Sequence, residues 1–141
     1  MAIMEKESPI KPLAKRLETG IESIDAQHRY LFATLALLET AIRKGEGEFQ
    51  VSKTIENLEK YSKRHFADEE ALFDRYSYPD AEAHRVQHRQ FIEFVLRLKD
   101  VRQWGNTELL ALNRSLELWL TEHIMKLDMV YAKFIKSKES S

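Results

Sequence analysis

The chain has 141 residues, which is enough for one domain of ordinary size with a hydrophobic core. Its 22 basic and 23 acidic residues give a formal net charge of −1, so the charge balance does not favour binding to nucleic acid or to an anionic membrane surface. The absence of cysteine excludes disulfides, thiolate metal sites, iron–sulfur clusters and thiol catalysis, and it is compatible with a reducing cytoplasm.

The first 20 residues have mixed charge and contain Pro9 and Pro12. Because of these two features, we interpret residues 1–20 as an extended N-terminal arm. They also lack the apolar core of a signal peptide. The most apolar run of the chain, from Leu31 to Leu38, is much shorter than the ~20 residues needed to span a bilayer. We therefore expect a cytoplasmic protein that does not insert into a membrane.

Glycine and proline divide the rest of the chain into four long segments without strand signals, which predicts an all-α fold. The expected helices span about 23–44, 49–76, 80–103 and 108–135. Ser23 and Asp80 are plausible N-caps for the first and third helices. The short links favour an up-down-up-down antiparallel four-helix bundle over residues 21–136, followed by a flexible tail at 137–141.

The first two predicted helices each place polar residues on an apolar face. His28 lies in a stripe that runs from Ile24 to Ile42 with spacings of three and four, which is typical of a bundle seam. In the second helix the stripe is apolar in its first half and then continues with His65 and Glu69. Because residues four apart lie on one face of a helix, His65 and Glu69 should point the same way.

The last two helices carry the remaining histidines. His84 and His88 open the third helix on one face, and His123 follows the apolar half of the fourth helix. In an antiparallel bundle these polar halves meet at one end and the apolar halves at the other. Asp128 lies five residues after His123, which is ~140° around an ideal helix. We therefore expect a π-type bulge between them, since such bulges occur often at functional sites.

The inward positions of these polar side chains point to a metal centre. A buried, unpaired polar group is costly, and here all five histidines lie on the apolar faces and are accompanied by the carboxylates of Glu69 and Asp128. Imidazole suits zinc, copper, iron and nickel, and bridging carboxylates favour a pair of harder ions. Two octahedral ions sharing two carboxylates and an oxo or hydroxo bridge would leave one position open for a small ligand. The seven candidate ligands are His28, His65, Glu69, His84, His88, His123 and Asp128.

These motifs resemble those of the bacterial hemerythrins, single-domain proteins of the HHE type. The resemblance covers roughly residues 20 to 135, in order. It rests on Ile24-Asp25-x-Gln27-His28, His65-Phe66-x-x-Glu69-Glu70, Tyr78-Pro79-x-x-x-x-His84-x-x-x-His88 and Trp119-Leu120-x-x-His123-Ile124-x-x-x-Asp128.

The resemblance implies a non-haem di-iron centre that binds O2 reversibly, in a carrier, store or delivery protein. It assigns His84, His88 and His123 to the coordinatively full iron and His28 and His65 to the iron with the open position. Glu69 and Asp128 would bridge the two ions. It also implies an O2 pocket that excludes water. The pocket residues are Leu31, Phe66, Trp119, Leu120 and Ile124.

Several neighbouring residues have other interpretations. Glu70, Glu122 and Lys126 are expected on the solvated surface. Asp25 could pair with His28, or it could simply be favoured in the first turn by the helix dipole. Tyr131, one turn beyond Asp128, matches a tyrosine near the site in the resembling family, and its role stays open.

The alternatives to an O2-binding protein differ in class. A ferritin-type di-iron oxidase would carry Glu-x-x-His repeats, and a zinc hydrolase would carry His-Glu-x-x-His; this sequence has neither. A di-iron redox enzyme acting on peroxide or nitric oxide, and an O2 or redox sensor, stay open. No general base or nucleophile is evident apart from the ligands, so we expect a binding protein rather than an enzyme. We also expect it to be a monomer. An oxygen-using enzyme or a sensor protein is a possible partner.

Overall fold

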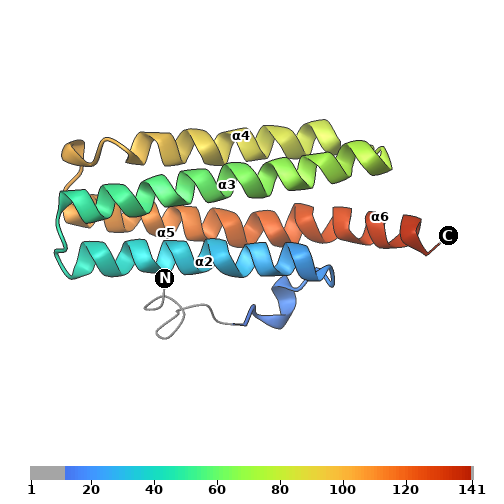
Figure 1. The fold of residues 1–141 in the computed structure, drawn as a ribbon, viewed down its shortest axis with the longest axis horizontal. Helices are drawn as coiled ribbons and strands as arrows, with labels where there is room; N and C mark the ends of the chain where they lie inside the picture. The colour runs from blue at the N-terminus through green and yellow to red at the C-terminus, as the bar shows by residue number, and fades with distance from the viewer. Residues whose placement is uncertain (1–11, 141) are drawn as a thin grey trace.

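The computed structural model describes residues 12–140, and residues 1–11 of the predicted arm and Ser141 lie outside this range. Four long helical segments run side by side along the molecule (Figure 1). They are α2 (Glu22–Arg43), α3 (Glu48–Tyr76), α4 (Ala81–Leu98) and a fourth segment formed by α5 (Asn106–His123), η3 (Ile124–Asp128) and α6 (Met129–Glu139). The predicted all-α antiparallel four-helix bundle is confirmed.

Each helix packs against its neighbours in the bundle. Helix α2 contacts α3 and α5, and α4 contacts α3 and α5, so the four segments close around a common interior (Figure 1). A short 3₁₀ helix, η1 (Lys15–Leu17), precedes α2 and contacts η3, and a second one, η2 (Val101–Gln103), follows α4. In residues 12–140 no helix combines the length and apolar character that crossing a bilayer requires.

The start of α2 and the end of α4 differ from those expected from the sequence. Ser23 is not the N-cap of α2: Ile21 holds that position, and Asp25 within the helix accepts hydrogen bonds from the backbone N–H groups of Thr19 and Gly20. Helix α4 ends at Leu98, because the chain turns into η2 before Gln103.

The C-terminal helix is longer than expected. Residues 137–139, predicted to belong to the flexible tail, continue α6 to Glu139. The hydroxyl of Tyr76 donates a hydrogen bond to Glu139 (3.0 Å), and the Lys136 ammonium group donates one to the Thr19 carbonyl (2.7 Å). These contacts tie the end of α6 to α3 and to the chain before α2.

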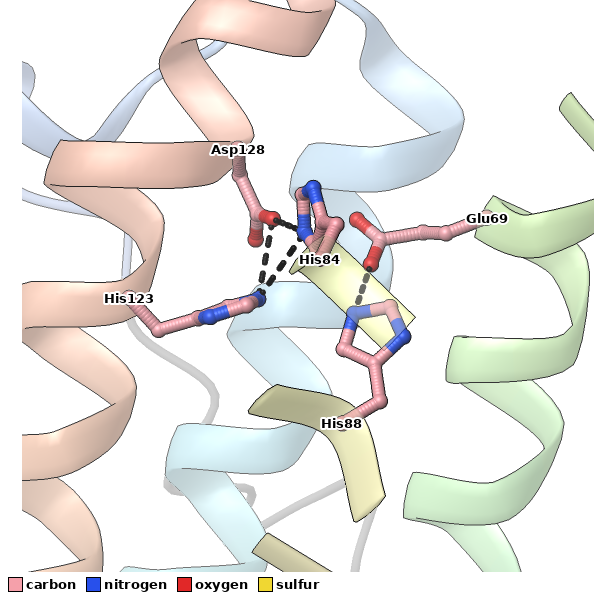
Figure 2. Close-up of side chains that lie close together, drawn as sticks. All are labelled: Glu69, His84, His88, His123 and Asp128. Carbon is pink, nitrogen blue, oxygen red and sulfur yellow. Dashed lines mark hydrogen bonds and ion pairs between the residues drawn. The ribbon is translucent and has the colours of Figure 1, made fainter. Parts of the chain in front are cut away.

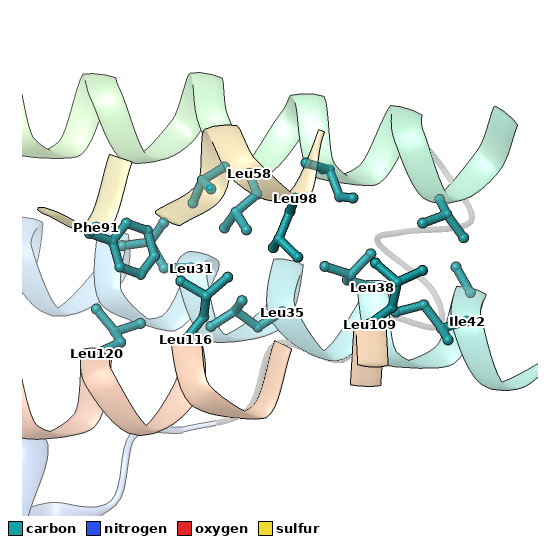
Figure 3. Packing of buried hydrophobic residues seen from close by; sticks show 14 of the residues in the cluster. Leu31, Leu35, Leu38, Ile42, Leu58, Phe91, Leu98, Leu109, Leu116 and Leu120 are labelled. Atoms are coloured by element: carbon teal, nitrogen blue, oxygen red, sulfur yellow. The ribbon is translucent and has the colours of Figure 1, made fainter. Parts of the chain in front are cut away.

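The apolar interior is divided into two clusters. The larger one fills the bundle where α2 and α3 join, and Figure 3 shows leucines from all four segments meeting there. The smaller one contains Ile24, Phe73, Tyr78, Tyr131 and Ile135. Along each helix the predicted ligands fall between residues of the two clusters. The sequence predicted the polar centre at one end of the bundle and the apolar residues at the other. The polar centre instead lies between two apolar layers.

Candidate metal centre

The seven side chains predicted as ligands converge in the interior of the bundle. They come from α2, α3, α4, α5 and η3, and each retains at most 3% of its accessible surface. Figure 2 shows five of them around one small volume: Glu69, His84, His88, His123 and Asp128.

Asp128 faces histidines from three helices. Its Oδ1 lies 2.8 Å from Nε2 of His84 and 3.1 Å from Nε2 of His123 (Figure 2). Its Oδ2 lies 2.9 Å from Nε2 of His28. The two oxygens of this carboxylate therefore face different histidines.

The two carboxylate oxygens of Glu69 also face different histidines. Its Oε1 lies 3.1 Å from Nε2 of His88 (Figure 2), and its Oε2 lies 3.6 Å from Nε2 of His65. Each carboxylate thus presents one oxygen to each half of the centre. This is the arrangement that two bridging carboxylates would need.

The candidate ligand atoms form two overlapping groups, and within each group they lie within 4.8 Å of one another. Both groups contain Glu69 and Asp128. The first adds His84, His88 and His123; the second adds His28 and His65. The residues present can therefore surround two ions that share two carboxylates.

Buried atoms without hydrogen-bond partners support binding of a cation. Within residues 12–140 these include Nε2 of His28, His65 and His88, Oε1 of Glu69 and Oδ2 of Asp128. Leaving such groups unpaired in an apolar interior is costly, and a coordinated metal ion would satisfy all of them. The mixture of imidazole nitrogen and carboxylate oxygen suits iron, among other first-row transition metals.

Burial favours the neutral form of two histidines. It lowers the pKa of His65 to about 4 and that of His88 to about 3. Burial also acts to lower the pKa of His28, but Asp128 and the other nearby carboxylates outweigh it, and the pKa rises. Neutral imidazoles at pH 7 are the form that binds a metal ion.

The two carboxylates respond differently to the same interior. Burial and the neighbouring Asp128 raise the pKa of Glu69. Burial acts to raise the pKa of Asp128 too, but His123 and hydrogen bonds from the surrounding histidines hold it well below its ordinary value. Asp128 is therefore the carboxylate with the stronger preference for its ionised form.

The predicted π bulge is confirmed. Segment η3 (Ile124–Asp128) is a π-helix, in which the backbone N–H of Met129 donates to the carbonyl of Ile124 five residues earlier. The wider turn brings Asp128 onto the same side as His123, so their side chains approach within 3.1 Å. A regular α-helix would have rotated Asp128 away from the centre.

Three histidines have hydrogen-bond partners on their outer nitrogen. The Nδ1 atom of His65 lies 2.6 Å from Oε1 of Gln27. That of His88 lies 2.8 Å from Oε2 of Glu70, and that of His123 lies 3.1 Å from Oε1 of Gln87. When each Nδ1 carries the proton and donates it outward, Nε2 is free to face the centre.

These outer partners were not predicted from the sequence. Glu70 was expected on the solvated surface, but it is only 31% exposed and contacts His88, so that expectation was wrong. Gln27, Glu70 and Gln87 each follow or precede a candidate ligand by one position, which puts them at the edge of the inward face. Asp25 does not pair with His28 by a hydrogen bond; it binds the Thr19 hydroxyl (2.7 Å) and the backbone of the arm.

The predicted pocket residues border the centre on the side of the larger cluster. Leu31, Leu120 and Ile124 are fully buried in it. Phe66 stacks on the His88 ring (centroids 3.9 Å apart), and Trp119 stacks on the His123 ring (4.6 Å). Trp119 is only partly buried and lines a surface groove of about 470 Å³ whose floor includes His123. Trp119 therefore covers one face of the His123 ring at the edge of the bundle.

Comparison with known proteins identifies the family. The model of the hemerythrin HHE cation-binding domain matches residues 19–135, most of the chain. The chain belongs to the hemerythrin family. The match includes every helix that contributes to the centre, since it begins just before α2 and ends within α6.

Named hemerythrins resemble the chain over most of its length. It is 32% identical to a bacteriohemerythrin of Pseudomonas paraeruginosa over 124 residues, which cover 88% of the chain and 80% of that protein. It is 33% identical to a bacteriohemerythrin of Stenotrophomonas maltophilia over 121 residues, covering 86% and 78%. It is 30% identical to a myohemerythrin of Theromyzon tessulatum over 114 residues, covering 81% and 84%.

Proposed function

We propose that this hemerythrin-family chain binds O2 reversibly at a non-haem di-iron centre, as an oxygen carrier, store or delivery protein. The observation that carries the proposal is the division of the buried donors into two groups that share both carboxylates. Its similarity to proteins named bacteriohemerythrin and myohemerythrin supports the same conclusion.

The two groups suggest a ligand assignment. His84, His88 and His123 would hold one iron, and His28 and His65 would hold the other. Glu69 and Asp128 would bridge them, because each presents its two oxygens to different histidines. The second group has one histidine fewer, so it would leave the position open for O2. The chemistry that a bound iron pair supplies is reversible electron transfer to O2.

The role of the protein around that chemistry is to keep the site dry. Leu31, Phe66, Leu120 and Ile124 present apolar surface with at most 3% exposure, and Trp119 covers His123 at the edge. Excluding water and protons from the open position would suppress irreversible oxidation of the iron. A dry interior also strengthens each hydrogen bond made within it.

We place the protein among binding proteins rather than enzymes. In the described residues, the seven candidate ligands are buried together, and the hydroxyl of Tyr131 donates a hydrogen bond to Glu69. We propose O2 as the physiological ligand and a cytoplasmic location, with an oxygen-using enzyme or a sensor protein as the partner.

Iron content tests the ligand assignment. Wild-type protein loaded anaerobically with ferrous iron should retain two irons per chain and take up one O2 per pair, releasing it when the O2 pressure falls. His84→Ala and Glu69→Ala should lose iron while keeping most of their helix content. Glu122→Ala is the matched control, because Glu122 precedes His123 but lies on the surface beside Lys126. Two irons per chain in the His84 or Glu69 variant would refute the assignment.

A further inference from the structure

The outer partners of the histidines differ in charge between the two halves of the centre. Among residues 12–140, Nδ1 of His28 and of His84 has no hydrogen-bond partner. The Nδ1 atoms of His65 and His123 are each paired with an amide oxygen, and that of His88 is paired with a carboxylate oxygen. The carboxylate belongs to Glu70 and contacts His88, in the group that has three histidines.

The environment of Glu70 holds its carboxylate against His88. Oε2 lies 2.8 Å from Nδ1 of His88, and Oε1 lies 3.7 Å from the guanidinium of Arg85. Arg85 also binds Asp74 at 2.6 Å, which fixes it between α3 and α4. Glu70 is thus an anionic acceptor oriented from both sides.

In the half of the centre that contains His65, the outer carboxylate does not contact the histidine directly. It is reached through the side chain of Gln27. Gln27 accepts from His65 with Oε1 and donates with Nε2 to Asp68 at 2.9 Å. Because Asp68 can only accept, the amide must present its oxygen to His65. His65 therefore meets a neutral partner, and the charge of Asp68 lies behind it.

An anionic partner makes an imidazole a stronger electron donor to its metal than a neutral partner does. Hydrogen bonds to an ionised acceptor are about twice as strong as neutral ones. We propose that Glu70 makes the His84–His88–His123 half of the centre the more electron-rich half, and so stabilises the oxidised state of the iron pair. Glu70 is a positioning and tuning residue in this account, and the inference rests on the proposed iron pair.

Replacing the charge while keeping the shape isolates this effect. In Glu70→Gln an amide oxygen can still accept from His88, as Gln27 and Gln87 do for their histidines. We expect two irons per chain and a reduction potential raised by about 59 mV, which corresponds to a tenfold shift of a one-electron equilibrium toward ferrous iron. Glu82→Gln is the control, because it removes one negative charge that also faces Arg85 but touches no histidine. Its potential should match the wild type.

A second variant moves the charge rather than removing it. Gln27→Glu combined with Asp68→Asn places the carboxylate directly against His65 and leaves the net charge unchanged. We expect this double variant to lower the reduction potential, opposite in sign to Glu70→Gln. It keeps the inference testable even if Glu70→Gln binds iron poorly.

The outcomes separate this inference from the proposed function. Equal shifts in Glu70→Gln and Glu82→Gln, or no shift in Glu70→Gln, would overturn it, as would an unchanged potential in the double variant. A wild-type protein that holds two irons but does not release O2 would refute reversible O2 binding and leave the tuning by Glu70 intact. A wild-type protein without an iron pair would refute both.

Discussion

The hydroxyl of Tyr131 donates a hydrogen bond to Oε2 of Glu69 over 3.1 Å, and neither side chain has measurable exposure to solvent. Burial and the neighbouring carboxylates raise the pKa of Tyr131, so the hydroxyl keeps its proton. The sequence left the role of this tyrosine open. The structure gives it one: it orients a carboxylate that faces both halves of the centre.

Tyr131→Phe removes this hydrogen bond and keeps the ring packed in the smaller apolar cluster. We expect the iron affinity to fall about 10–100-fold, the usual effect of losing an outer partner of a ligand, so that a chelator removes iron faster than from the wild type. Tyr78→Phe removes a hydroxyl from the same aromatic cluster without touching Glu69, and its iron loss should match the wild type. Equal rates in both variants would show that Tyr131 does not support Glu69.

The role of the π bulge can be tested by changing the number of residues between His123 and Asp128. Deleting Met125, which is 44% exposed, should convert η3 to regular α-helix and leave His123 and the following aspartate four residues apart. Four residues advance about 40° beyond one full turn, so both side chains stay on one face. We expect two irons per chain in the deletion variant.

Inserting one alanine after Met125 is the converse test. It should rotate Asp128 by about 100° away from the centre and reduce the iron content. If the deletion lost iron while its helix content was unchanged, the wider turn itself would be needed to place Asp128. Metal analysis and circular dichroism of the two variants measure both properties.

Substitutions of Leu120 and Leu98 distinguish an effect on stability from an effect on the kinetics of O2 binding. Both are about 1% exposed in the larger cluster, and Figure 3 shows Leu98 further along the bundle toward Leu109. Leu120→Ala and Leu98→Ala should each lower the free energy of unfolding by about 2–5 kcal/mol. Only Leu120→Ala should speed O2 release and autoxidation in stopped-flow measurements. Identical kinetics in the two variants would remove Leu120 from the O2 pocket.

Glu59 gives a pH dependence that is independent of the centre. Hydrogen bonds from Lys63 (2.7 Å) and then Lys99 (2.8 Å) lower its pKa from the ordinary value of 4.5. A carboxyl group whose pKa is lower in the folded state stabilises the protein above its unfolded pKa, and this contribution is lost as the pH falls through the lowered value. Glu59→Gln should therefore reduce the urea midpoint of iron-free protein at pH 7.

The same substitution should have little effect below the lowered pKa, because the wild-type side chain is then neutral as well. Glu93→Gln, on the exposed face of α4, is the control and should behave as the wild type at both pH values. A deficit in Glu59→Gln that persisted in acid would mean that packing rather than charge accounts for the effect.

The sequence predicted the fold and the seven converging side chains because both depend on periodicity. Six of the seven candidate ligands, all except Asp128, take positions in a helical stripe that an apolar residue would otherwise fill, so His28 stands between Ile24 and Leu31 in the same seam. The five-residue spacing of His123 and Asp128 broke this pattern, and that break was itself the signal for the π bulge. Their role as ligands stays a prediction until metal is measured.

The residues that the sequence did not assign act across helices. Glu70 and Gln87 lie one position from a ligand and look like surface residues on their own helices. Their contacts with His88 and His123 depend on how α3, α4 and α5 are rotated against one another, which no single stripe specifies. The end of α4 at Leu98 was missed for a similar reason, because no glycine or proline marks the turn into η2.

The central claim is reversible O2 binding by an iron pair, and the visible spectrum tests it most directly. The reduced, iron-loaded protein should be nearly colourless under argon, gain a charge-transfer band when air is admitted, and lose that band when O2 is removed again. The cycle should repeat without loss of amplitude. Immediate conversion to a stable ferric spectrum that deoxygenation does not reverse would contradict the account and favour a redox enzyme or a sensor.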